Sequence, residues 1–246
     1  MEKMVERLGL YDIWTTLFPG MIFVGGIKTL CDYMLKILQR KPYIIDNSIE
    51  FQQLKIFYPT DIYGLFSFIV VSYLCGHILH ELSSMAKQHI IYRKGKPTEL
   101  LLEKKGKVLN SQQIQMYNQV FLKLNGNQKY SEDDFEKRRK ESQNIFNIMN
   151  TELQSKGISS RYVKLNLIYN MCFTVCMAII LMLMHIFVFV IYQFIKHRNL
   201  YISELLGIVI ALTAVFLVLY LRGNRYYIYW VRNIVISYNN SIQGNG

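Results

Sequence analysis

The chain has 246 residues, of which 52% are hydrophobic and only 18% charged, and its formal net charge is +11. A mean hydropathy of +0.16 is high for a soluble domain of this length and argues against an ordinary soluble protein. In a membrane protein, this basic excess indicates contact with an anionic membrane surface before it indicates nucleic acid.

The first apolar segment, residues 13–27, reads IWTTLFPGMIFVGGI and is interrupted by one Pro-Gly pair and one Gly-Gly pair. No small-residue cleavage site follows it, so we predict a kinked membrane-spanning helix rather than a signal peptide. Lys28, Asp32 and Lys36 recur every four residues and continue one polar stripe along the far half of this helix. These side chains either stand in water beyond the bilayer or line an aqueous passage.

Three further segments contain no Asp, Glu, Lys or Arg: residues 62–79, 165–195 and 205–221. About 20 apolar residues cross a bilayer as a helix, because backbone groups cannot stay unpaired in hydrocarbon. We therefore predict an all-α integral membrane protein with four transmembrane helices and a cytoplasmic helical insert between helices 2 and 3.

This layout divides the chain into four parts. They are a first transmembrane helix pair (1–82), the helical insert (83–160), a second transmembrane pair (161–222) and a tail (223–246). Lys and Arg are concentrated in the amino-terminal tail, the insert and the carboxy-terminal tail. The positive-inside rule then places both termini and the insert in the cytoplasm.

Capping residues divide the insert into helices. Ser111 is expected to cap one helix that ends at Asn125, and Ser131, followed by three acidic residues, is expected to begin another. The second helix should end at Gly157. The last ten residues, SYNNSIQGNG, are expected to form a frayed tail.

The third spanning helix carries a polar stripe, because Asn166, Asn170, Thr174 and His185 fall on one helical face. Polar groups in a membrane helix normally turn toward partner helices or toward water. The stripe therefore either forms hydrogen bonds between helices or lines a pore. A pore needs several copies of the chain, because four helices enclose little room.

Two histidines and an acid, His77, His80 and Glu81, share a face at the end of the second spanning helix. A metalloprotease helix requires H-E-x-x-H, and the fourth position after His80 is Ser84. Hydrogen bonding at the membrane interface is the favoured interpretation, and a metal site completed from another helix is the alternative.

A basic run on the insert, Lys137, Arg138, Arg139 and Lys140, forms either a solvated helix face or a contact for phosphate or a partner. The four cysteines all fall in or beside membrane segments, and we expect them to be reduced packing residues. No arrangement typical of catalysis is present, so we predict no enzyme activity, no cofactor and no metal.

Three stretches carry a resemblance to a known group: YDIWTTLFPG (11–20), GHILHELSS (76–84) and LRGNRYYIYWVRNIVISY (221–238). They are similar to small four-helix bacterial membrane proteins of phage-defence loci, including those accompanying CRISPR type VI-B nucleases. The resemblance covers the layout of the whole chain, and it implies no catalytic residues.

The resemblance implies an antiviral defence protein of the bacterial inner membrane. The leading interpretation is an oligomeric effector that permeabilises or depolarises the membrane on activation. The alternative is a membrane anchor or sensor whose basic insert recruits a soluble defence partner, such as a nuclease or a nucleic-acid-binding protein. No direct nucleic-acid binding is assumed, and a small channel or transporter is disfavoured because no paired-repeat layout is present.

Overall fold

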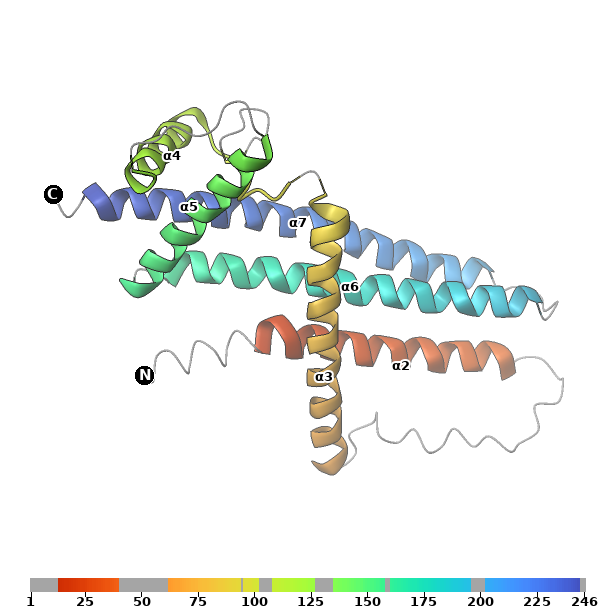
Figure 1. Ribbon diagram of the computed structural model, residues 1–246. Helices are drawn as coiled ribbons and strands as arrows, with labels where there is room; N and C mark the ends of the chain where they lie inside the picture. Colours follow the sequence, from red (N-terminus) through yellow and green to blue (C-terminus); the bar gives the residue numbers. More distant parts are fainter. Residues whose placement is uncertain are drawn as a thin grey trace. The chain divides into compact units, whose positions relative to one another are not determined.

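A computed structural model gives the structure of the protein and describes residues 13–39, 62–93, 95–101, 108–126, 135–157, 160–195 and 202–243. Within these ranges the secondary structure is helical, with six α-helices, two short π-helical segments and no strand (Figure 1). The predicted all-α class is confirmed. Four helical stretches are long and apolar enough to cross a membrane, and they contain the four predicted segments: Ile13–Leu35, Ile62–Ile91, Tyr162–Ile195 and Leu205–Ile242.

The elements follow one another in this order: η1 (Ile13–Leu17), α2 (Phe18–Gln39), α3 (Ile62–Ala86), η3 (Lys87–Ile91), α4 (Ser111–Leu124), α5 (Phe135–Ser155), α6 (Ser160–Ile195) and α7 (Ile202–Gln243). The predicted kink in the first helix corresponds to the change from η1 to α2, just before Pro19. Proline has no N–H to donate, so a wider turn is tolerated at this point.

Local sequence explains where α4 and α5 end. The expected cap at Ser111 was wrong by one residue, because Asn110 is the N-cap of α4. The Asn110 side chain accepts a hydrogen bond from Gln113 N at 2.8 Å, and the Gln113 side chain accepts one from Asn110 N at 3.0 Å. After the helices, Gly126 (φ +60°) and Gly157 (φ +71°) adopt the left-handed backbone that glycine favours. The predicted ends are confirmed, whereas the predicted start at Ser131 lies outside the described residues.

By its internal contacts the chain divides into two compact units, each built from separate stretches of sequence. Unit 1 comprises Met1–Met85 and Asn170–Arg222, and unit 2 comprises Ala86–Tyr169 and Gly223–Gly246. The expected layout treated the insert and the carboxy-terminal tail as separate parts, whereas unit 2 combines them. Helices α6 and α7 each contribute residues to both units.

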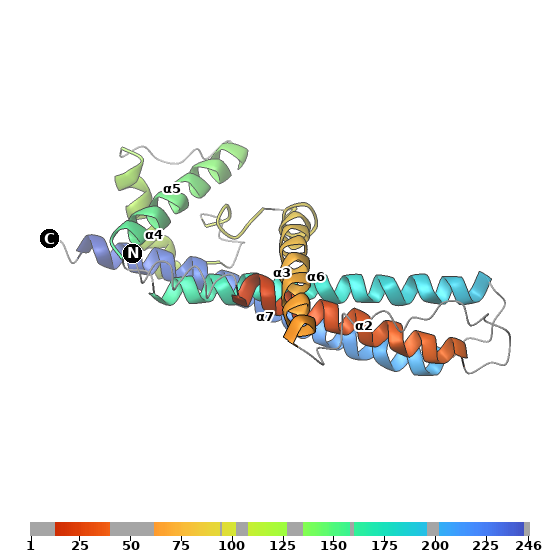
Figure 2. The same ribbon diagram turned by 90° about the horizontal axis from the view of Figure 1, so that it is seen from below.

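In unit 1, α2 runs alongside α6 and the first half of α7 (Figures 1 and 2). Apolar side chains from all three helices form a buried cluster: Leu30, Met34, Met182, Ile186 and Leu205. Many large apolar side chains on the opposite faces are exposed, as expected where lipid or another protein surface covers a helix.

Helix α3 crosses α2 rather than running alongside it (Figures 1 and 2). Gly20 and Gly76 lie at the crossing, together with Ser72, whose side chain is fully buried. A Cβ atom on Gly20 would overlap the Ser72 carbonyl, and one on Gly76 would overlap the Thr16 carbonyl. The two helices therefore approach each other at backbone distance, which only small residues permit.

Unit 2 has its own apolar core, built from α4, α5 and the ends of α6 and α7. Its most deeply buried side chains are Leu101, Tyr117, Phe121, Phe146, Met149, Leu153, Val231, Ile234 and Val235. Tyr238 is 2% exposed and donates a hydrogen bond to Glu152 Oε2 at 2.9 Å. The expectation of a frayed tail was wrong for residues 237–243, because α7 extends to Gln243 and packs into this core.

Candidate functional site

The polar stripe and the histidine cluster meet inside unit 1. Thr174 on α6 is fully buried, and its hydroxyl donates a hydrogen bond to the Asn170 carbonyl at 2.9 Å. The same oxygen lies 3.4 Å from Nδ1 of His80 on α3. Because the Thr174 hydroxyl donates its hydrogen within α6, its oxygen accepts a hydrogen bond from His80 Nδ1–H. This contact joins α3 to α6.

A second member of the stripe contacts α2. Nε2 of His185 lies 3.6 Å from Sγ of Cys31, within hydrogen-bonding reach for sulfur. Both side chains are half-buried. Thr174 and His185 thus each contact a neighbouring helix of the same chain. Contacts between helices were one of the two alternatives for this stripe, and a pore lining was the other.

The remaining stripe residues are distributed over both units. Asn170 is 8% exposed in unit 1, and Asn166 is half-buried in unit 2. On α2, Lys28 and Asp32 are half-buried and both interact with other groups. Lys36 belongs to α2, but its side chain lies outside the described part of the structure. A lining role for these residues in an assembly of several copies stays a prediction.

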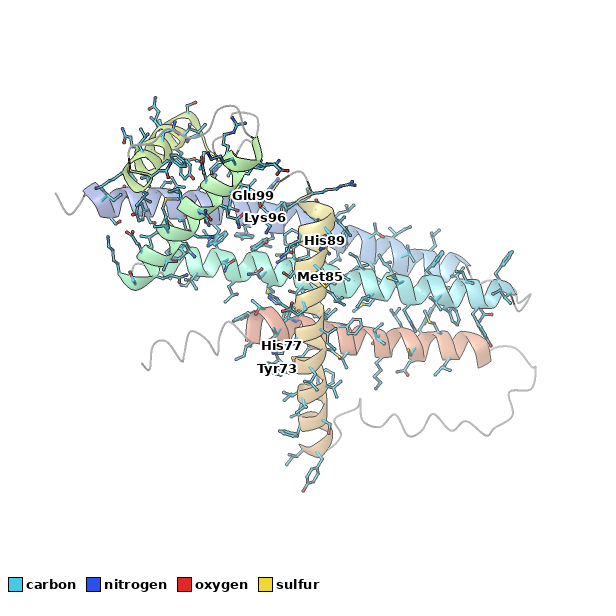
Figure 3. All side chains as sticks on the ribbon, viewed as in Figure 1. Tyr73, His77, Met85, His89, Lys96 and Glu99 are labelled. Carbon is cyan, nitrogen blue, oxygen red and sulfur yellow. The ribbon has the colours of Figure 1, made fainter. Side chains whose placement is uncertain are left out.

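His77 and Glu81 do not converge with His80 on one point. Both are exposed, and the His77 ring packs edge-on against Tyr73 of the same helix, with ring centroids 4.5 Å apart (Figure 3). Among the residues that the structure describes, no group of three or more His, Cys, Asp or Glu side chains could hold a metal ion. His80 instead uses Nδ1 toward Thr174.

Unit 2 contains a stack of aromatic rings that the sequence analysis missed. The rings of Tyr169 and Tyr227 are stacked at 4.6 Å, Tyr227 stacks on Trp230 at 5.7 Å, and Trp230 meets the edge of Phe146 at 5.3 Å. Lys87, only 8% exposed, places Nζ 4.7 Å from the centre of the Tyr169 ring. The spacing of Tyr227 and Trp230 by three residues was the available sequence signal.

A buried hydrogen-bond chain ties α4 to α5 in the same unit. The Tyr117 hydroxyl donates to the Ser142 carbonyl at 3.1 Å, and the Ser142 hydroxyl donates to the Thr98 carbonyl at 3.2 Å. Burial raises the pKa of Tyr117 well above its ordinary value, because water does not reach its phenolate form. The chain fixes the segment around Thr98 against α5.

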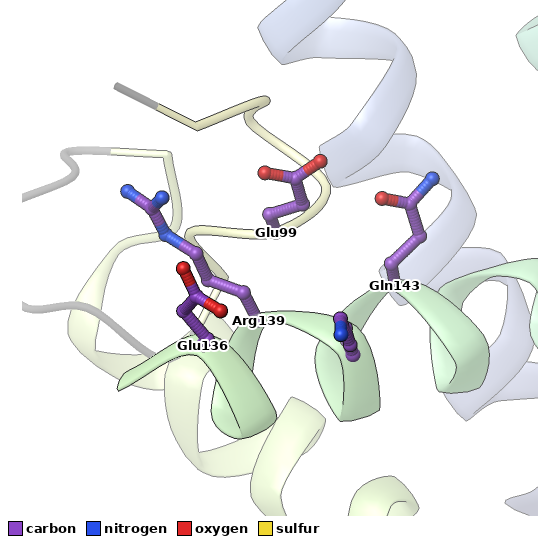
Figure 4. A pocket seen from close by; sticks show the side chains of 5 residues that line it. Glu99, Glu136, Arg139 and Gln143 are labelled. Carbon is purple, nitrogen blue, oxygen red and sulfur yellow. The ribbon is translucent and has the colours of Figure 1, made fainter. Parts of the chain in front are cut away.

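A charged cavity of about 250 Å³ adjoins that segment (Figure 4). It is lined by Glu99, Glu136, Arg139, Lys140 and Gln143. Gly95 has φ +119°, and a Cβ atom there would lie 2.7 Å from the Arg139 guanidinium, so glycine leaves room for this side chain. Of the predicted basic run, Arg139 and Lys140 line the cavity, whereas Lys137 and Arg138 do not.

The Glu99 carboxylate also closes its own turn, because it accepts a hydrogen bond from the Lys96 backbone N–H at 3.1 Å. Figure 3 shows Lys96 and Glu99 on the segment between α3 and α4. The cavity therefore combines two cationic and two acidic side chains from two separate elements. Such a lining suits a partner that brings both signs of charge better than it suits a bare phosphate.

The fold and these sites define a class: an all-helical protein with four helices long and apolar enough to span a membrane and a second, helical unit with its own core. Comparison with family models, with curated proteins and with solved structures gave no match.

Proposed function

We propose that the chain is a multi-pass protein of the bacterial inner membrane that serves antiviral defence as an anchor and sensor. In this proposal unit 2 lies in the cytoplasm, with both termini, and receives a soluble protein partner at the charged cavity. The defence role rests on the resemblance of the three sequence stretches, and the sensor role rests on geometry.

One observation carries the sensor role. Helices α6 and α7 each supply buried core residues to unit 2, including Tyr169 and Tyr227, and continue into unit 1, where Phe173 and Leu205 are buried. A partner that alters the core of unit 2 therefore acts on two of the three helices that form the apolar cluster of unit 1. Switching proteins use such shared helices to pass a local packing change onward.

The second candidate is an oligomeric effector that permeabilises or depolarises the membrane. Exposed apolar side chains on α7, available to lipid or to another copy, favour it: Leu206, Ile210, Val215, Leu217, Val218 and Leu221. The contacts of Thr174 and His185 argue against this candidate, because those two side chains already have partners on α3 and α2 of the same chain.

Charge reversal at the cavity tests the proposal. Arg139→Glu with Lys140→Glu should abolish protection of a bacterium against phage, while membrane levels of the protein stay unchanged. Lys123→Glu with Lys156→Glu changes two exposed cations outside the cavity lining and should leave protection intact. If the wild-type chain, expressed with its neighbouring genes, protects against no phage, the defence role is wrong.

Membrane potential during infection separates the two candidates. An anchor and sensor leaves the potential of infected cells unchanged, whereas an effector depolarises them and loses this effect with Asn170→Leu or His185→Leu. Subunit number supplies the independent check by native mass spectrometry in mild detergent. A closed ring of four or more copies supports the effector, and a monomer or a dimer supports the anchor.

A further inference from the structure

The contact between Cys31 and His185 joins two metal-ligating side chains from different helices. Sγ of Cys31 on α2 and Nε2 of His185 on α6 lie 3.6 Å apart, and both side chains are half-buried and therefore reachable. Thiolate sulfur and neutral imidazole nitrogen are two of the strongest protein ligands for late first-row metals.

The separation of the two atoms matches that of ligands that share one ion. Metal–sulfur bonds of about 2.3 Å and metal–nitrogen bonds of about 2.0–2.1 Å place the ligand atoms roughly 3.6–3.8 Å apart, at angles between tetrahedral and trigonal. The observed 3.6 Å falls at the short end of that range, so the two atoms are already spaced as two ligands of one ion.

Two methionines flank this pair, one helical turn to either side of it, and each is a further soft ligand. Met34 lies one helical turn after Cys31 on α2, and Met182 lies one turn before His185 on α6. Both are 4% exposed and belong to one buried cluster with Leu30 and Ile186. Methionine has three rotatable bonds and a polarisable sulfur, so either thioether can turn toward an ion between the helices.

We propose that Cys31 and His185 form the centre of a binding site for a soft monovalent metal ion, Cu(I) being the physiological candidate, with a thioether from Met34 or Met182 as third ligand. On binding, the ion replaces the Cys31 thiol proton, which is released to solvent. A monovalent ion with one thiolate is electrically neutral, which suits an apolar bundle, whereas a divalent ion leaves an uncompensated charge. This inference stands independently of the proposed function.

The test measures Cu(I) binding to the full-length protein, purified through an affinity tag that contains no histidine and handled so that its cysteines stay reduced. A background with Cys75→Ser, Cys172→Ser and Cys176→Ser leaves Cys31 as the one thiol. Competition against a Cu(I) chelator should then show that one Cu(I) ion binds per chain. This binding should be lost in Cys31→Ser and in His185→Asn. Met34→Leu combined with Met182→Leu should lower the Cu(I) affinity by about 10- to 100-fold. Zn(II) should bind more weakly than Cu(I).

A measurement on the unmodified chain covers the case in which variants fail to fold. Equimolar Cu(I) should protect Cys31 from alkylation, while Cys75, which belongs to α3 and to neither helix of the proposed site, keeps reacting. Ligand assignment by X-ray absorption should show mixed sulfur and nitrogen coordination. Undiminished binding in Cys31→Ser, equal protection of Cys31 and Cys75, or a sulfur-only shell each overturns the proposal.

Discussion

Gly20 of α2 and Gly76 of α3 bring these two helices together at backbone distance. A Cβ atom on either residue would overlap backbone atoms of the opposite segment, the Ser72 carbonyl in one case and the Thr16 carbonyl in the other. The two glycines are 56 positions apart in the chain, and their reciprocal fit defines the crossing point of unit 1. Close packing of this kind replaces the hydrophobic effect as the main force between helices in a bilayer.

Gly20→Ala or Gly76→Ala should therefore lower the free energy of unfolding by about 1–3 kcal/mol, the usual cost of overpacking. Thermal unfolding in detergent, followed by size-exclusion chromatography of the heated sample, measures the change. Gly25→Ala is the matched control, because a Cβ there meets no atom within 4 Å. Equal stability of all three variants would show that α3 does not cross α2 in this way.

The contact between His80 and Thr174 should be detectable as a coupling energy. In a double-mutant cycle with His80→Leu and Thr174→Val, we expect a coupling of about 0.6 kcal/mol, the mean for hydrogen bonds between membrane helices. The cycle removes the contribution of the Thr174 bond to Asn170, which both arms share. His77→Leu with Thr174→Val should be additive, since His77 faces away. Zero coupling in the first cycle would contradict this contact and would leave Thr174 among the candidates for a pore lining.

Tyr227 holds the aromatic stack of unit 2 together, because its ring lies between those of Tyr169 and Trp230. Tyr227→Ala should destabilise unit 2 by about 3–5 kcal/mol, as expected for removing a large buried ring. Hydrogen exchange of the α5 amides measures the loss, because α5 packs Phe146 against Trp230. Tyr229→Ala, at a neighbouring ring that is 48% exposed, should leave this exchange almost unchanged.

The buried Tyr117 predicts a specific sensitivity to alkali. Its pKa is raised in the folded state above the value of about 10 in an unfolded chain. The stability that it contributes is therefore fully present below pH 10 and is lost as the pH rises beyond that value. Tyr117→Phe should cost about 1 kcal/mol at neutral pH, through the lost bond to Ser142, and should flatten the decline above pH 10.

The unfolding midpoints of the wild-type protein and of Tyr117→Phe, compared between pH 8 and pH 11, measure this difference. The other tyrosines are present in both proteins, so their titration contributes equally to the two curves. Ser142→Ala serves as the reference, since it weakens the same hydrogen-bond chain without removing the titrating group. Parallel declines for wild-type and Tyr117→Phe would contradict the assignment.

The amino-acid sequence by itself determined the elements of this protein. Long runs without charged residues predicted the four long helices, because the number of apolar residues needed to cross a bilayer depends on local sequence alone. Asn125-Gly126 and Gly157 marked helix ends, because a left-handed backbone is a local preference of glycine. Even the missed cap at Asn110 was present locally, as an Asn followed three residues later by Gln113.

Only the tertiary structure decided which elements share a core. The carboxy-terminal tail looked frayed because its polar and small residues carry no local signal, yet Tyr238 is buried and bonded to Glu152, 86 positions earlier. The pairs His80 with Thr174, Cys31 with His185, and Lys87 with Tyr169 likewise join distant positions. Such pairings depend on the crossing and register of whole helices, which result from packing over many side chains at once and leave no trace in the spacing of any one segment.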